Sequence, residues 1–229
     1  MNHFVTSAFL VFIFTLAVGI YFILQPRSLD RLFGSFWLSV AFWTCLVGMQ
    51  FQILSRISGH LWGWFLHVGC ISVPVIFCHF ALCAAGRDEH RSIALKAAYV
   101  IAVSFVLLNT FTDLFTQGTI YQDQYAYPKP AILYPVYILF FQAMGIWSVF
   151  LILKWGKKLQ VTQRKDLYLF LALHALAYVG AMDNFLIMYD IRIFPLYPYG
   201  LYLILPYAIF GSYAFSKLQT TQLSSSNGI

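Results

Sequence analysis

Seven stretches of mostly apolar residues occupy almost the whole chain, and short polar connections separate them. Each stretch is close to the ~20 residues that a helix needs to cross the ~30 Å hydrocarbon core of a bilayer. We therefore predict an all-α membrane protein that forms a seven-transmembrane helix bundle. The predicted spans are Phe4–Gln25, Phe33–Leu54, Leu61–Ala84, Ile93–Phe115, Ile132–Trp155, Leu167–Tyr189 and Leu196–Lys217.

The basic residues alternate between a rich side and a poor side of these spans. Only three of the 14 Lys and Arg residues fall on the poor side, namely Arg56, Lys129 and Arg192. Cytoplasmic connections carry the excess of Lys and Arg in membrane proteins. The pattern predicts an N-terminus outside and a C-terminus in the cytoplasm.

The composition agrees with a membrane protein, and the distribution of charge favours lipid over nucleic acid as a partner. Hydrophobic residues make up 61% of the chain and charged residues 10%, a balance unsuited to a soluble fold. The net charge of +6 sits in short connections beside the membrane, where it suits anionic lipid head groups better than nucleic acid. We expect one seven-helix transmembrane domain over residues 1–217, followed by a short polar cytoplasmic tail over residues 218–229.

Two of the outer connections have a distinctive amino-acid composition. The segment Thr116–Ala131 is rich in Tyr and Pro and predicts a partly ordered cap at the interface. The turn Ile193–Gly200 before the last span contains Pro195 and Pro198, which mark where helix gives way to turn and resumes.

Polar residues near the outer ends of several spans are the main candidates for a binding site. Each costs free energy in hydrocarbon unless it has a partner or faces a wet cavity. Such a layer could hold a small ligand or could instead form interhelical hydrogen bonds that stabilise the bundle. The candidate ligand-binding residues are His67, Asn109, Asp113, Gln142, Asp183 and Asn184.

Two histidines lie deeper. His79 and His174 are each seven residues from the inner end of their spans, which places both about 10 Å from the inner interface. If they face one another they could hold a haem or a metal. Structural hydrogen bonds to neighbours are the interpretation that we favour, so we predict no cofactor and no metal.

The chain has no recognisable catalytic constellation. It lacks the zinc motif HExxH, the nucleophile elbow GxSxG and a phosphate-binding glycine loop. The four cysteines have no CxxC spacing, and we interpret them as buried thiols that pack as small apolar residues. We therefore do not expect an enzyme.

Several segments resemble, in order, parts of one family. Ile71–Arg87, ISVPVIFCHFALCAAGR, resembles the third span of the seven-helix N-terminal sensor region of bacterial membrane histidine kinases, and Tyr125–Phe141, YAYPKPAILYPVYILFF, resembles its outer Tyr-Pro loop and fifth span. Gln163–Tyr189, the turn Ile193–Gly200 and the closing LPYAIFGSYAF are similar to its last two spans. The resemblance implies a signalling protein of the bacterial inner membrane. The family's kinase is absent from this sequence, so we expect any output to pass through a separate protein.

Two functions from different classes remain. One is a non-catalytic, receptor-like sensor that acts with a separate cytoplasmic or membrane signalling partner. The other is an accessory subunit that packs against partner helices of a larger integral-membrane complex. The resemblance and the polar layer favour the sensor, whereas the missing output domain favours the subunit. We expect membrane lipids and other proteins as partners in both cases.

Overall fold

The computed structural model describes residues 3–52, 59–87, 92–122 and 125–226. Within these ranges, seven helices are long and apolar enough to cross a membrane, so the predicted all-α seven-helix bundle is confirmed. Arg56 and Arg91, two of the basic residues used to predict orientation, lie outside the described residues. The first six spans are α1 (His3–Ile23), α2 (Ser28–Gln52), α3 (Gly59–Ala84), α4 (Ile93–Phe111), α5 (Tyr134–Gly156) and α6 (Val161–Ile187).

The seventh span is divided into short segments. It begins with α7 (Leu196–Tyr199) and the 3-10 turn η1 (Gly200–Leu203), and continues through α8 (Ile204–Pro206) and the π-helical η2 (Tyr207–Gly211). The regular helix α9 (Ser212–Ser226) follows. Because α9 runs to Ser226, the boundary expected after Lys217 falls inside a helix.

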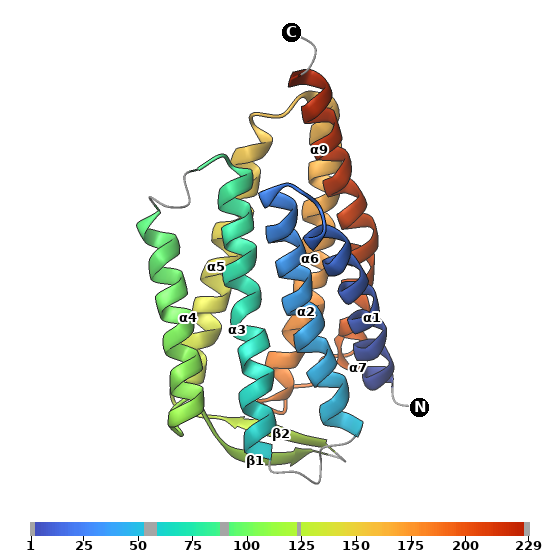
Figure 1. Ribbon diagram of the computed structural model, residues 1–229. Coiled ribbons are helices and arrows are strands. Elements are labelled where there is room, and N and C mark those ends of the chain that lie inside the picture. The colour runs from blue at the N-terminus through green and yellow to red at the C-terminus, as the bar shows by residue number, and fades with distance from the viewer. Residues whose placement is uncertain (1–2, 53–58, 88–91, 123–124, 227–229) are drawn as a thin grey trace.

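A β-hairpin closes one end of the bundle, which we call the hairpin end (Figure 1). Its antiparallel strands are β1 (Thr116–Gln122) and β2 (Tyr125–Pro130). The register is irregular between Thr116 and Thr119, where Gly118 adopts a φ of +64°. A Cβ added to Gly63 in α3 would lie 2.8 Å from Pro128, so the hairpin packs directly on the bundle. The partly ordered cap predicted from the sequence is this hairpin.

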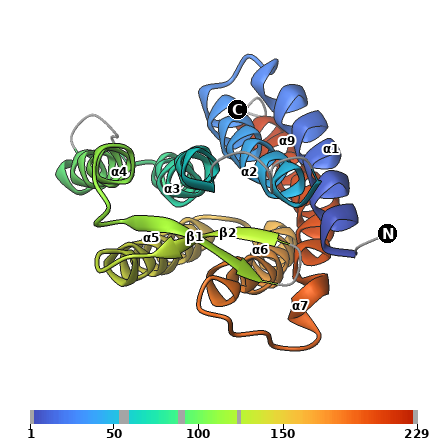
Figure 2. The same cartoon turned by 90° about the horizontal axis from the view of Figure 1, so that it is seen from below.

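The bundle has a buried centre and an apolar periphery. Viewed from the hairpin end, α1 to α4 follow one another along one side, α5 and α6 lie on the other, and the hairpin crosses between them (Figure 2). Of the span residues in α2 and α3, 61% are buried, against 28% in α4. Exposed apolar side chains such as Val100 and Ile146 therefore belong to a surface that lipid covers.

An aromatic core holds the helices together toward the end opposite the hairpin. The ring of Phe33 in α2 lies 4.4 Å from that of Phe215 in α9 and 5.1 Å from that of Phe80 in α3, measured between centroids. At the same end, Lys158 donates a 2.9 Å hydrogen bond to the carbonyl of Ala85, just after α3. A cation at a helix C-terminus also interacts favourably with the helix dipole.

Candidate functional site

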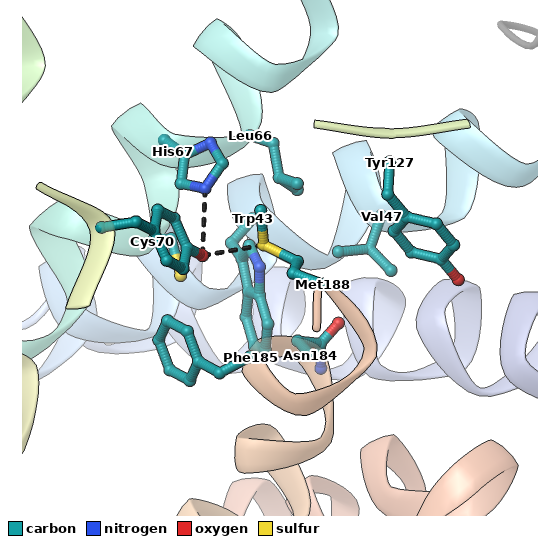
Figure 3. Close-up of a pocket in the computed structure, with 10 residues that line it drawn as sticks. Trp43, Val47, Leu66, His67, Cys70, Tyr127, Asn184, Phe185 and Met188 are labelled. Atoms are coloured by element: carbon teal, nitrogen blue, oxygen red, sulfur yellow. Dashed lines mark hydrogen bonds between the residues drawn. The ribbon is translucent and has the colours of Figure 1, made fainter. Parts of the chain in front are cut away.

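A small cavity with a few polar groups in a mostly apolar lining lies beneath the hairpin. Its volume is about 20 Å³, and residues of α2, α3, β2, α5 and α6 together with Met188 line it (Figure 3). One water molecule needs roughly 10–15 Å³ on this measure. The cavity therefore has room for a single water molecule and not for an organic ligand.

A chain of polar contacts forms one wall of this cavity. His67 Nδ1 lies 2.6 Å from the Gly63 carbonyl oxygen, and His67 Nε2 lies 3.2 Å from the hydroxyl of Tyr134. A carbonyl oxygen only accepts, so Nδ1 carries the proton and Nε2 accepts from Tyr134. The thioether of Met188 lies 2.8 Å from the same hydroxyl and is the weaker acceptor for its single proton. The chain links α3, α5 and the residue after α6.

Of the other predicted ligand residues, only Asn184 lines this cavity. Asn109 is buried and accepts from the Thr116 hydroxyl at 3.0 Å, while its amide donates to the Trp64 carbonyl at 3.3 Å. It thereby ties α4 to α3 and to the hairpin. Asp113 follows the end of α4 and is exposed, because α4 stops at Phe111, four residues before the end of the predicted span.

Gln142 bridges α5 and α6. Its side-chain oxygen accepts from the Tyr178 hydroxyl at 2.7 Å, and its amide lies 3.0 Å from the thioether of Met182. Gln142 thus fixes the position of the Tyr178 ring, away from the cavity beneath the hairpin.

Asp183 is fully buried, and neither of its carboxylate oxygens has a hydrogen-bond partner among the described residues. It sits where α6 meets the start of the last span. A Cβ added to Gly200 would lie 3.3 Å from Asp183 Cβ, and one added to Gly180 would lie 2.2 Å from the Gly200 carbonyl oxygen. The backbones of the two segments are therefore in direct contact beside the carboxylate.

A second cavity lies deeper in the bundle and is almost wholly aromatic and aliphatic. Its volume is about 60 Å³, and α2, α3, α5, α6 and the last span line it. Three of its lining residues carry buried polar atoms without a hydrogen-bond partner in the described structure: Trp37 Nε1, His174 Nδ1 and the Tyr207 hydroxyl. Their rings form one cluster, because the Tyr207 centroid lies 4.9 Å from that of Trp37 and 5.2 Å from that of His174.

The two deep histidines lie on different sides of α3. His174 stacks on Phe77 with ring centroids 4.1 Å apart, whereas His79 Nδ1 lies 2.9 Å from the hydroxyl of Tyr99 in α4. Phe77 and His79 are two residues apart, about 200° around a helix, so they face opposite directions. No group of three or more His, Cys, Asp or Glu side chains positioned for a metal occurs in the part of the chain that the structure describes.

Several aromatic residues with a polar atom line these cavities without standing out in the sequence, among them Tyr134 in the first and Trp37, Tyr178 and Tyr207 in the second. They lie in apolar runs, where residue type does not distinguish them from their neighbours. A polar atom at the tip of each Tyr and Trp needs a partner when it is buried, and that property is visible in a sequence.

Comparison with known proteins does not assign the chain to a family. No protein-family model matches the chain, and no curated protein matches it. What is established is the class, an integral membrane protein whose fold is a seven-helix bundle.

Proposed function

We propose that the protein is a non-catalytic, receptor-like sensor of the bacterial inner membrane that acts with a separate signalling partner. In this proposal the hairpin end faces outside and α9 passes the response to the cytoplasmic side. The observation that carries it is the seventh span, which is broken into short segments and packs beside Asp183, a fully buried residue whose carboxylate has no hydrogen-bond partner among the described residues.

The broken span supports a structure with more than one state. Short 3-10 and π segments often mark functional hinges, because their hydrogen-bond geometry is poorer than that of an α-helix. η1, α8 and η2 follow one another over residues 200–211. A rearrangement of these residues would move α9 relative to α2 and α3, against which Phe215 of α9 packs through Phe33 and Phe80.

The buried carboxylate supplies a driving force for such a change. Burial of a polar group without a hydrogen bond costs several kcal/mol, and more when the group is charged. The Cβ of Asp183 lies beside Gly200, and neither carboxylate oxygen has a hydrogen-bond partner among the described residues. A second arrangement of the last span that gives Asp183 a partner would therefore compete with the one described.

A contact at the opposite end would hold α9 in one state. Arg27, between α1 and α2, donates a 2.8 Å hydrogen bond from Nη1 to the side-chain oxygen of Gln219 in α9. Arg27, Asp30 and Gln219 line a polar cavity of about 160 Å³. Polar contacts of this kind exchange readily for contacts with water or a protein partner.

The accessory-subunit function remains the second candidate. It is favoured by the size of the cavity beneath the hairpin, which holds one water molecule, and by the hydrogen bonds that occupy Asn109 and Gln142. These features are those of a bundle held by interhelical hydrogen bonds.

Spin-label distances distinguish the two functions. The four cysteines are replaced by alanine, and labels are placed at Lys96 and Lys217, both exposed, on α4 and α9 at the end opposite the hairpin. α4 and α9 lie at opposite sides of the bundle (Figure 2). Pulsed electron resonance in lipid nanodiscs should give two distances for a sensor, and Asp183→Asn should shift the distribution to one.

The matched control is Asp113→Asn, which changes an exposed aspartate in the same way. We expect the control to reproduce the unmodified distribution. A single distance that is the same in all three proteins would overturn the sensor and favour the subunit.

A further inference from the structure

A groove on the outer surface of α5 and α6 adjoins the aromatic cavity. Its volume is about 290 Å³, and its lining residues are Gly145, Ile146, Val149, His174, Ala175, Tyr178 and Val179. Ile146 and Val179 are 71% and 49% exposed, so the groove opens to the surroundings of the bundle. These residues lie near the middle of their helices, which places the opening at the depth of the lipid tails.

His174 and Tyr178 line both the groove and the aromatic cavity. The Tyr178 ring packs against Gly145, where an added Cβ would lie 3.0 Å away, and Gln142 holds its hydroxyl. Tyr178 is therefore a partition between the two spaces. Trp37 and Tyr207 line the cavity on the far side of this partition.

The chemistry of the lining restricts what could occupy this path. No charged side chain lines either space, so a charged head group would be left unpaired at the centre of the membrane. The groove and the surface of the cavity are almost entirely apolar, but Trp37 and Tyr207 line the cavity and carry buried polar atoms without a described partner, an indole N–H that only donates and a hydroxyl. An occupant that satisfies these groups needs an apolar body and an oxygen that accepts hydrogen bonds.

We infer that the groove and the aromatic cavity form one binding site for a neutral, lipid-soluble molecule with a carbonyl or hydroxyl oxygen at one end. The apolar part lies in the groove, near the ~300 Å³ lower end of the range for small-molecule pockets. The oxygen lies in the cavity and accepts from Trp37 and Tyr207. This inference names the ligand class of the proposed sensor. It rests on that proposal only in treating the bound molecule as the signal, because binding itself can be measured separately.

Two probes that differ only in the oxygen test the site. 2-Undecanone and undecane are each added to the purified full chain in nanodiscs, and the midpoint of thermal unfolding is measured over a concentration series. The ketone should raise the midpoint saturably by about 3 °C or more beyond the alkane. Equal effects of the two probes would overturn the inference, because partition into lipid does not need the polar atoms.

Two pairs of variants locate the effect. Tyr207→Phe removes one hydroxyl in the cavity and Ala175→Phe fills the groove from an exposed position, and each should abolish the advantage of the ketone. Tyr213→Phe and Ala172→Phe alter exposed residues of the same spans that line neither space and should retain it. If Tyr207→Phe does not fold, Ala175→Phe still decides, since an undiminished ketone effect in that variant would contradict the site.

This experiment and the spin-label experiment can fail separately. Selective ketone binding would support the site even if the spin labels at Lys96 and Lys217 gave a single distance that is the same in all three proteins. That combination would overturn the sensor and leave the binding site in place. Two distances without selective binding would do the reverse.

Discussion

Gly180 shows how one residue determines the packing of the last span. Its position lets the backbones of α6 and η1 touch, with the Gly200 carbonyl oxygen where a side chain would begin. Gly180 has small neighbours in α6, Ala177 and Ala181, and small residues of this kind can also admit a partner helix in a membrane. The structure uses Gly180 inside the chain, so a bulky substitution there would disturb the fold before it disturbed any complex.

The first prediction follows from this contact. Gly180→Ala should lower the thermal unfolding midpoint by roughly 5 °C or more, because its Cβ would lie 2.2 Å from backbone that has to move. Ala172→Leu adds a larger group to an exposed position of the same helix and should leave the midpoint nearly unchanged. A midpoint for Gly180→Ala at or above that of the unmodified protein would show that the helices do not approach so closely.

The sequence does not indicate which Trp and Tyr residues have a hydrogen-bonding group near a cavity. His67, His174 and Asp183 stand out in apolar spans by residue type. Trp37 and Tyr207 do not, because their rings pack as core and only the three-dimensional arrangement brings the two residues together around one cavity.

At the scale of elements, the apolar pattern determined six spans well. Length and hydrophobicity are sufficient there, since a spanning segment has to satisfy its backbone hydrogen bonds within one helix. The seventh span was predicted as one helix, and it is broken over residues 196–211. Pro195, Pro198 and Gly200 indicated its start, but the π-helical turn depends on packing against α6 that no local pattern encodes.

The end of α9 gives the second prediction. Arg27→Ala removes the hydrogen bond to Gln219, so the backbone amides of residues 212–219 should exchange with deuterium roughly tenfold faster. Exchange is measured by mass spectrometry on the protein in nanodiscs. Arg31→Ala, an exposed arginine one turn further along, is the control and should not change exchange in α9. Unchanged exchange in Arg27→Ala would mean that the contact does not hold α9.

At the scale of the whole molecule, the bundle has two chemically different ends. The hairpin covers one end with Tyr, Pro and Thr residues, and Lys129 is the basic residue among its strands. The opposite end carries Arg27, Arg31, Arg87, Lys96, Lys154, Lys157, Lys158, Arg164, Lys165 and Lys217. The fold therefore gathers at one end the residues that the linear pattern assigns to the cytoplasm.

The last prediction tests that orientation with two equivalent substitutions. In a variant without native cysteines, Lys129→Cys places a thiol on the hairpin and Lys157→Cys places one at the opposite end, and both positions are exposed. An impermeant maleimide added to intact spheroplasts should label the first and not the second, because positive residues favour the cytoplasmic side. Both should react after the membrane is dissolved, which controls for thiol reactivity. Labelling of Lys157→Cys alone would reverse the orientation and place the hairpin in the cytoplasm. Equal labelling of both variants in intact spheroplasts would contradict a bundle with a single orientation in the membrane.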